Sequence, residues 1–171
     1  MSVVLLTGPA AAGKNTISHL LARKRQKCAV IDVDLVRWMY LHPHRAPWEG
    51  EEGQAQRLLG VENACLLAKN FAQNNIDVIV LDVLVDETAR VYKQQLHEYA
   101  PLIVLLLPTF EEAYRRFTER GHSISVDQFA LVYRWQEALQ VVDYKIDNTL
   151  LSAEDVAQKV DTLLEAAHSQ Q

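Results

Sequence analysis

One loop near the start of the chain constrains the fold more than any other stretch. It runs from Gly8 to Thr16 with the sequence GPAAAGKNT, after the apolar run Val3–Leu6 and before a helical pattern of apolar residues. Two glycines let the backbone curl so that successive N–H groups point at one anion, and the new helix adds its positive end. Lys14 then reaches the terminal phosphates as a point charge. A turn of small residues with a chance lysine is the alternative, but the full GxxxxGK spacing between strand and helix favours a phosphate-binding loop.

The position after the lysine departs from the standard motif. Ser or Thr in that place holds Mg²⁺ through its hydroxyl, whereas this chain has Asn15 there and Thr16 one residue later. The pattern resembles the adenylate and cytidylate kinases, whose loops read Gly-Lys-Gly-Thr and whose threonine contacts phosphate. Asn15 could offer an amide oxygen or leave the ion to water. The departure therefore bears on direct magnesium ligation more than on nucleotide binding.

The composition is that of a globular protein, with 171 residues of which 49% are hydrophobic and 23% charged. We expect residues 1–171 to form a single domain. The net charge of −5 and the lack of an extended basic stripe argue against nucleic acid as a partner. Two cysteines, Cys28 and Cys65, are expected to be free thiols, and no apolar run approaches a membrane span. Without a recognisable leader, we expect a cytoplasmic protein, either monomer or homodimer.

Continuous apolar runs alternate with helical patterns along the chain. Runs such as Val78–Leu81 and Leu102–Leu107 carry no polar residues, as expected for strands buried on both faces. A parallel sheet between layers of helices follows, in a three-layer α/β fold. The predicted strands are Val3–Thr7, Ala29–Val33, Asp77–Val83, Leu102–Leu107 and Tyr144–Asp147, and the predicted helices lie near 14–25, 52–74, 87–99, 109–120, 126–140 and 152–167.

Two aspartates and an arginine follow the second predicted strand. In an open parallel sheet, ligands bind at the carboxyl ends of the strands, so Asp32 and Asp34 are expected on the same rim as the phosphate-binding loop. Arg37 lies about one helical turn beyond Asp34. Such a group suits phosphoryl transfer, because a carboxylate can accept the proton of an acceptor hydroxyl while an arginine holds the acceptor or the transferring group. The alternative is local: Asp34 caps the next helix and pairs with Arg37 at i, i+3.

The loop Gly8–Thr16 followed by Asp34 and Arg37 resembles one branch of the P-loop kinases. The branch includes the phage-type polynucleotide 5′-kinases, the zeta-toxin-like kinases and chloramphenicol phosphotransferase, and more loosely the gluconate and shikimate kinases. The resemblance implies a five-stranded parallel sheet in the order 2-3-1-4-5, with ATP as donor and Mg²⁺ as cofactor. It also implies that Asp34 is the general base and that Arg37 clamps the acceptor or the phosphate. It does not select one member of the branch.

A helix predicted after the fourth strand carries two arginines on one face, because Arg116 and Arg120 are four residues apart. Kinases of this branch carry an Arg-x-x-x-Arg lid here. By resemblance, Arg116 would lie near the base or the phosphates, Arg120 would neutralise the γ-phosphate, and the lid would be the short segment His122–Val126. The alternative is an amphipathic helix whose arginines pair with Glu112 and Glu119.

Further acidic and polar residues are candidates for holding the metal. The third predicted strand ends near Asp82, where P-loop proteins place the acid that orients Mg²⁺ through water. Asp82 and Asp32 therefore compete for this role. The candidate metal-side residues are Asn15, Thr16, Asp32 and Asp82.

The nucleotide is assigned to the first loop and to the loop after the last strand. By resemblance to related kinases, Asn148 and Thr149 line the adenine, although a helix entry capped by Ser152 explains them equally well. The candidate nucleotide-binding residues are Gly8, Ala10, Ala11, Ala12, Gly13, Lys14, Asn15, Thr16, Asn148 and Thr149. Arg57 and Asn63 could face the acceptor, but we favour ordinary surface placement for both.

Together these inferences predict an ATP- and Mg²⁺-dependent kinase that acts on a hydroxyl of a small molecule or nucleotide. The predicted catalytic residues are Lys14, Asp34, Arg37, Arg116 and Arg120. Two alternatives stay open. One is a polynucleotide 5′-end kinase, against which the acidic net charge argues; the other is a nucleotide-binding regulatory or switch protein without an acceptor, which has no need of an Asp-x-x-Arg pair together with two lid arginines.

Overall fold

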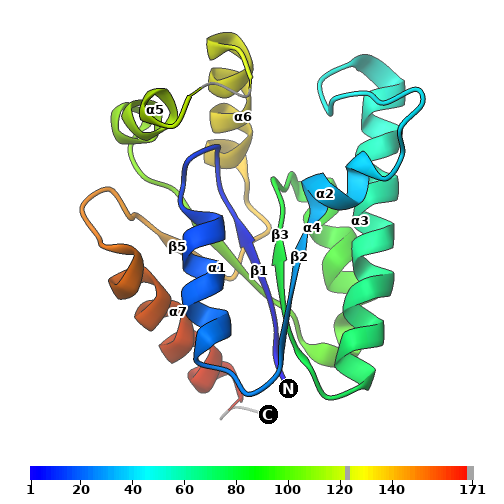
Figure 1. The fold of residues 1–171 in the computed structure, drawn as a ribbon, viewed down its shortest axis with the longest axis vertical. Coiled ribbons are helices and arrows are strands. Elements are labelled where there is room, and N and C mark those ends of the chain that lie inside the picture. The colour runs from blue at the N-terminus through cyan, green and yellow to red at the C-terminus, as the bar shows by residue number, and fades with distance from the viewer. Residues whose placement is uncertain (122–123, 169–171) are drawn as a thin grey trace.

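A five-stranded sheet forms the centre of the computed structural model, which describes residues 1–121 and 124–168 (Figure 1). Its strands lie in the order β2-β3-β1-β4-β5, and all the pairings are parallel. This confirms the predicted α/β class and strand order. The strands are β1 (Val3–Thr7), β2 (Cys28–Asp32), β3 (Asp77–Leu81), β4 (Leu102–Leu106) and β5 (Tyr144–Ile146).

Helices connect the strands and cover both faces of the sheet (Figure 1). They are α1 (Lys14–Arg23), α2 (Val33–Trp38), α3 (Gly50–Gln73), α4 (Asp86–Gln95), the 3₁₀ turn η1 (His97–Tyr99), α5 (Phe110–Glu119), α6 (Val126–Ala138) and α7 (Ala153–His168). The helix predicted near 87–99 divides into α4 and η1, and the other predicted helices are present with ends shifted by one or two residues. The predicted lid His122–Val126 includes residues 122 and 123, which lie outside the described part of the chain.

Alternate residues of each buried strand face opposite helix layers. In β1, Val3 and Leu5 pack in the cluster formed with α3 and α4, whereas Val4 and Leu6 pack in the cluster formed with α1 and α7. Successive side chains of a strand point to opposite faces, so a strand covered on both sides needs apolar residues at every position. The continuous apolar runs in the sequence have this cause.

The short helix α2 is a difference from the predicted elements. The second strand was predicted to reach Val33, which was wrong: the strand ends at Asp32, and Val33 is the first residue of α2. The Asp32 side chain accepts a hydrogen bond from the backbone N–H of Asp34 (3.1 Å) and caps the helix. Val33 is nevertheless buried in the core, which explains why it continued the apolar pattern of the strand.

The phosphate-binding loop joins β1 to α1 at the carboxyl end of the sheet. In Figure 1 it lies between two groups of elements, with α5 and α6 on one side and α2 and the start of α3 on the other. A separate apolar cluster holds the first group, since Phe117 of α5 and Phe129 of α6 pack together with Leu105 of β4. The fold therefore brings four helices from distant parts of the sequence to the end of the sheet that carries the loop.

Candidate active site

The backbone of the loop depends on its two glycines. Gly8 has φ +154°, and a Cβ atom placed there would lie 2.4 Å from the carbonyl oxygen of Leu106, closer than any side chain tolerates. Gly13 is the N-cap of α1 in the left-handed region, with φ +94°, and between them Ala11 also has a positive φ of 61°. This curled backbone has the conformation that the GxxxxGK spacing predicted.

Lys14 bends back over the loop. Its Nζ atom donates hydrogen bonds to the carbonyl oxygens of Gly8 (2.7 Å) and Pro9 (3.1 Å). Burial lowers the pKa of the Lys14 ammonium, and the carboxylates of Asp34, Asp82 and Asp32, in that order of strength, counteract the effect. The three predicted acidic residues therefore surround the same lysine.

Asp34 and Arg37 form the i, i+3 ion pair that the alternative interpretation expected. The Arg37 Nη1 atom lies 3.6 Å from an Asp34 carboxylate oxygen, and the Arg37 Nη2 atom donates to the carbonyl of Arg45 (2.9 Å). The helix cap is Asp32 and not Asp34, which leaves the Asp34 carboxylate 73% exposed. Asp34 thus has a carboxylate that is open to a substrate and close to Lys14. Its catalytic role stays a prediction.

Asp82 has a different environment from the other two aspartates. Burial raises the pKa of its carboxyl group to about 6, and the nearby negative charge of Asp34 adds to the increase. The backbone N–H of Val83 (2.7 Å) and the hydroxyl of Tyr92 (3.0 Å) donate to its two oxygens. Sequence reasoning missed Tyr92, because an apolar pattern in a helix does not show that one hydroxyl reaches a strand end.

The candidate metal-side residues supply oxygen donors beside the loop. Asn15 and Thr16 are exposed in the first turn of α1, while Asp82 and Asp32 follow neighbouring strands. Within residues 1–121 and 124–168, no group of three or more His, Cys, Asp or Glu side chains could hold a metal ion by itself. Mg²⁺ commonly takes one or two carboxylates and completes its shell with phosphate oxygens and water, and the donors present fit that mode.

The two predicted lid arginines have different surroundings. The Arg116 side chain donates to Glu112 (2.6 Å) and to the carbonyl oxygens of Asn148 (3.0 Å) and Thr149 (3.1 Å). It therefore joins α5 to the loop that follows β5. Arg120 is exposed at the end of α5, and its positive charge lowers the pKa of Lys14. Arg120 thus lies within electrostatic reach of Lys14.

Ion pairing on α5 follows the alternative interpretation for Arg115 and for the Arg116 pair with Glu112. Arg115 bridges Glu112 (2.8 Å) and Glu119 (2.5 Å) on the exposed side of the helix. Hydrogen bonds from Arg115 and Arg116 lower the pKa of the Glu112 carboxyl group to about 2. Among the described residues, Arg120 forms no ion pair with either glutamate.

The loop after β5 contacts the phosphate-binding loop directly. The buried Asn148 side chain donates to the carbonyl oxygen of Ala12 (2.9 Å) through Nδ2, while its Oδ1 atom is buried without a hydrogen-bond partner in the described structure. Thr149 accepts a hydrogen bond from the backbone N–H of Thr109 at the start of α5 (2.9 Å). Asn148 and Thr149 therefore connect the first loop with α5. A role in binding adenine stays a prediction.

A buried polar network, also missed by sequence reasoning, supports the strand that leads into the loop. The Thr7 hydroxyl donates to Gln136 of α6 (2.6 Å) and accepts from the backbone N–H of Leu84 (3.0 Å). Gln136 in turn donates to the Leu84 carbonyl (2.6 Å). A single buried glutamine in a helix gives no signal in the sequence, because only the folded chain shows which groups it hydrogen-bonds.

Arg57 also differs from expectation. It was predicted to lie at the surface, but only 13% of its side chain is exposed, and its guanidinium carbon lies 5.7 Å from the centre of the Trp135 ring. Asn63, by contrast, lines a pocket of about 220 Å³ between α2 and α3 together with Arg37.

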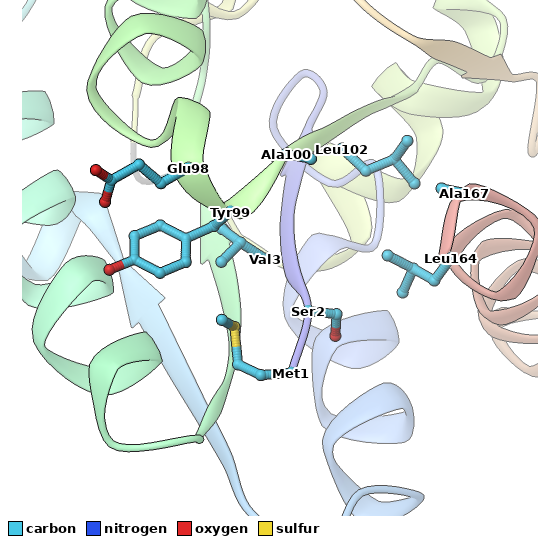
Figure 2. Close-up of a pocket in the computed structure, with 9 residues that line it drawn as sticks. All are labelled: Met1, Ser2, Val3, Glu98, Tyr99, Ala100, Leu102, Leu164 and Ala167. Carbon is cyan, nitrogen blue, oxygen red and sulfur yellow. The ribbon is translucent and has the colours of Figure 1, made fainter. Parts of the chain in front are cut away.

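A second, smaller pocket lies at the opposite end of the sheet. Figure 2 shows its lining side chains around the start of β1, which include Ser2, Tyr99 and Leu164. Its volume is about 110 Å³. Ligands of open parallel sheets bind at the carboxyl ends of the strands, and this pocket is at the amino ends, so it is not part of the candidate active site.

Comparison with known proteins places the chain in a family. The sequence pattern of a family described as an AAA domain matches residues 4–130, which is most of the chain. The chain belongs to this AAA-domain family. Its match covers the phosphate-binding loop, the Asp34 and Arg37 pair and the whole of α5. A search of curated proteins finds no match.

Solved structures resemble this member of the AAA-domain family along almost its whole length. A sugar kinase from Janibacter sp. HTCC2649 has a TM-score of 0.73 at 17% identity, covering 96% of this chain and 95% of that one. Shikimate kinase from Acinetobacter baumannii, in complex with shikimate, has 0.66 at 19% identity, covering 98% and 94%. The tunicamycin resistance protein of Deinococcus radiodurans has 0.66 at 16% identity, covering 95% of each chain. At these identities the likeness establishes the fold.

These comparisons support a P-loop kinase type of fold and do not single out one branch. The resemblance to the polynucleotide kinase, zeta-toxin and chloramphenicol phosphotransferase branch therefore stays a prediction. None of the helices in the described ranges combines the length and the apolarity needed to cross a bilayer.

Proposed function

We propose that the protein is a P-loop kinase that transfers the γ-phosphoryl group of ATP to a hydroxyl of a small molecule or nucleotide. The observation that supports the proposal most is that the curled loop holds Lys14 at the carboxyl end of the sheet, where the charges of Asp34 and Asp82 are close enough to act on its pKa. A phosphate-binding lysine beside an exposed carboxylate is the arrangement that phosphoryl transfer to a hydroxyl needs. Kinases among the similar solved structures support the same activity.

Each residue of the candidate site has a separate role in the proposed reaction. The loop amides and Lys14 bind the phosphates, and Asp34 accepts the proton of the attacking hydroxyl. Arg37, whose side chain is 9% exposed and anchored to the Arg45 carbonyl, orients the acceptor. Arg120 compensates the negative charge of the transferring group. Arg116, whose side chain donates to the carbonyls after β5, positions the nucleotide loop next to the phosphates.

The proposal includes Mg²⁺, which would bind together with ATP. Thr16, Asn15, Asp82 and Asp32 are the residues that would hold it, directly or through water. Bound Mg²⁺ neutralises charge on the phosphate oxygens. The cytoplasmic location and the monomeric or homodimeric state stay predictions.

An acceptor screen tests the proposal. ATP consumption with Mg²⁺ is measured with and without sugars, nucleosides, aminoglycosides, small hydroxy acids and a 5′-hydroxyl oligonucleotide. A kinase shows acceptor-dependent ADP formation, and Lys14→Met abolishes it. Slow hydrolysis that no acceptor accelerates would instead support the nucleotide-binding switch, and label transfer to the oligonucleotide would support the polynucleotide kinase.

A further inference from the structure

A tyrosine of the hydrophobic core donates its hydroxyl to a carboxylate of the candidate site. Tyr92 of α4 is fully buried and packs in the same apolar cluster as Leu84, Ala89 and Leu96. Its hydroxyl donates to one oxygen of Asp82 (3.0 Å), and this is the only hydrogen bond of that hydroxyl within the described ranges. Phenylalanine would fill the same apolar space, so the reason for a hydroxyl at this position lies at Asp82.

Asp82 lies beside the strand that leads into the phosphate-binding loop. It directly follows β3, and its backbone N–H donates to the carbonyl oxygen of Leu6 in β1 (3.3 Å), two residues before Gly8. The backbone at Asp82 is therefore well fixed, but the carboxylate at the end of its side chain is not fixed by the backbone. The last torsion of an aspartate joins an sp³ to an sp² carbon and has broad minima. Hydrogen-bond donors therefore decide how this carboxylate is turned.

Two donors hold the Asp82 carboxylate, one on each oxygen. The backbone N–H of Val83 donates to Oδ1 (2.7 Å), and the Tyr92 hydroxyl donates to Oδ2 (3.0 Å). The first donor is the next residue along the chain, whereas the second comes from α4 and links the carboxylate to the core. An ionised carboxylate has about four acceptor sites, so about two stay open to a ligand. Asp82 is partly exposed, which leaves a ligand access to them.

We propose that Tyr92 is a positioning residue, whose hydroxyl holds the Asp82 carboxylate in the orientation that receives Mg²⁺, directly or through water. The inference rests on the proposed function, in which Mg²⁺ binds together with ATP. Mg²⁺ requires nearly ideal octahedral geometry, so it is sensitive to the orientation of a carboxylate. Groups that hydrogen-bond a metal ligand commonly change metal affinity by about 10- to 100-fold when they are removed. Tyr92 thus gives α4, which is remote from the phosphate-binding loop in sequence, a role in the site.

The first test measures nucleotide binding and needs neither an acceptor nor phosphoryl transfer. A non-hydrolysable ATP analogue is titrated by calorimetry, once with EDTA and once with saturating Mg²⁺. The ratio of the two dissociation constants is the magnesium factor. The variant is Tyr92→Phe, which removes only the hydroxyl. The matched control is Tyr133→Phe, because Tyr133 is also buried but donates its hydroxyl to the backbone carbonyl of Pro108 (3.0 Å).

We expect the same magnesium factor in wild type and Tyr133→Phe, and a factor at least threefold smaller in Tyr92→Phe. The affinity of Tyr92→Phe for the metal-free analogue should stay within about twofold of wild type, because the loop and Lys14 bind the phosphates. Equal factors in wild type and Tyr92→Phe would overturn the proposal, as would an equal reduction in both variants or a wild type that Mg²⁺ does not affect. If Tyr92→Phe does not fold, para-fluorophenylalanine replaces Tyr92, since it fills the space of the hydroxyl without donating, and the same reduction is expected.

A double-mutant cycle with Asp82→Asn shows whether Tyr92 acts through Asp82. If it does, Tyr92→Phe does not reduce the magnesium factor further in the Asp82→Asn background. A further reduction of similar size would show that the hydroxyl acts elsewhere, which would overturn the proposal.

The outcomes for this inference and for the proposed function can be told apart. The expected magnesium factors together with a lack of transfer to any acceptor would count against the kinase and leave the role of Tyr92 standing. Acceptor-dependent turnover together with an unchanged magnesium factor in Tyr92→Phe would keep the kinase and overturn the role of Tyr92.

Discussion

At the scale of single residues, the buried carboxyl group of Asp82 opposes folding when it is ionised. Burial raises its pKa to about 6 from an ordinary value of 3.8. Between these values the folded protein binds more protons than the unfolded chain, so the free energy of unfolding falls as pH rises through this window. A difference of about two units corresponds to ~3 kcal/mol. The chain keeps this unfavourable group beside Lys14, as expected where a carboxylate serves function.

Replacing Asp82 with Asn tests this assignment. Without the carboxyl group, the loss of stability between pH 4 and pH 7 disappears, so the variant gains ~3 kcal/mol relative to wild type across that range. Urea unfolding at several pH values, without nucleotide or Mg²⁺, measures the difference. Glu154→Gln, an exposed residue in the first turn of α7, serves as control and keeps the wild-type profile. A constant difference between Asp82→Asn and wild type at all pH values would contradict the account.

The same scale shows which site residues were accessible from sequence alone. Gly8, Gly13 and Lys14 were predicted because a fixed spacing reports a backbone shape, and the structure has that shape. The prediction that Arg57 lies at the surface was wrong. An arginine on a helix is normally expected to be exposed, and only the structure shows the contacts of Arg57 with Trp135 and Glu87. Burial of a charged side chain is a property of the neighbouring elements and leaves no local pattern.

At the scale of elements, the packing of α2 on α3 determines where Arg37 points. Gly60 leaves room for the Arg37 stem, and the following turn of the chain supplies the Arg45 carbonyl that accepts its Nη2 hydrogen bond. The helix α2 has only six residues. Six residues make fewer than two helical turns, too few for the 3.6-residue hydrophobic repeat to be recognised in the sequence.

The variant Gly60→Ala changes the packing of Arg37 on α3 while leaving the stability of the fold nearly unchanged. Alanine is favoured over glycine inside a helix by ~1 kcal/mol, which offsets the loss of about one Arg37 hydrogen bond, so the free energy of unfolding changes by ~1 kcal/mol or less. The new methyl group displaces the Arg37 side chain, and KM for the acceptor rises. Steady-state kinetics and urea unfolding measure both effects.

A double-mutant cycle gives the control for that prediction. If Gly60→Ala acts through Arg37, then its effect on KM largely disappears in an Arg37→Met background. Additive effects of the two substitutions would show that the methyl group disturbs another part of the site.

At the scale of the whole molecule, the buried network of Thr7, Leu84 and Gln136 joins the central strand to α6. Thr7 directly precedes Gly8, so the network fixes the point where the sheet passes into the phosphate-binding loop. The buried parallel strands were predictable from their continuous apolar runs, and the order of the strands came from the resemblance to P-loop kinases. The attachment of α6 to the central strand was not predictable, because it depends on one buried side chain, that of Gln136.

Gln136→Leu conserves volume and removes the hydrogen bonds. Buried groups of Thr7 and Leu84 then lack partners, which lowers the free energy of unfolding by ~1–3 kcal/mol and weakens ATP binding. Chemical unfolding and nucleotide titration measure these effects, with the exposed Gln94→Leu as control. Unchanged stability and ATP affinity would show that the network is dispensable.

The most direct test of the central claim compares wild type and Asp34→Asn in one transfer assay with an acceptor identified by the screen. Asn keeps the size of the side chain but cannot accept the hydroxyl proton. We predict a fall in kcat on the order of 10²–10⁴, with the affinity for ATP unchanged within about twofold, since the phosphates are bound by the loop and Lys14. Near wild-type turnover in Asp34→Asn would contradict the proposed mechanism.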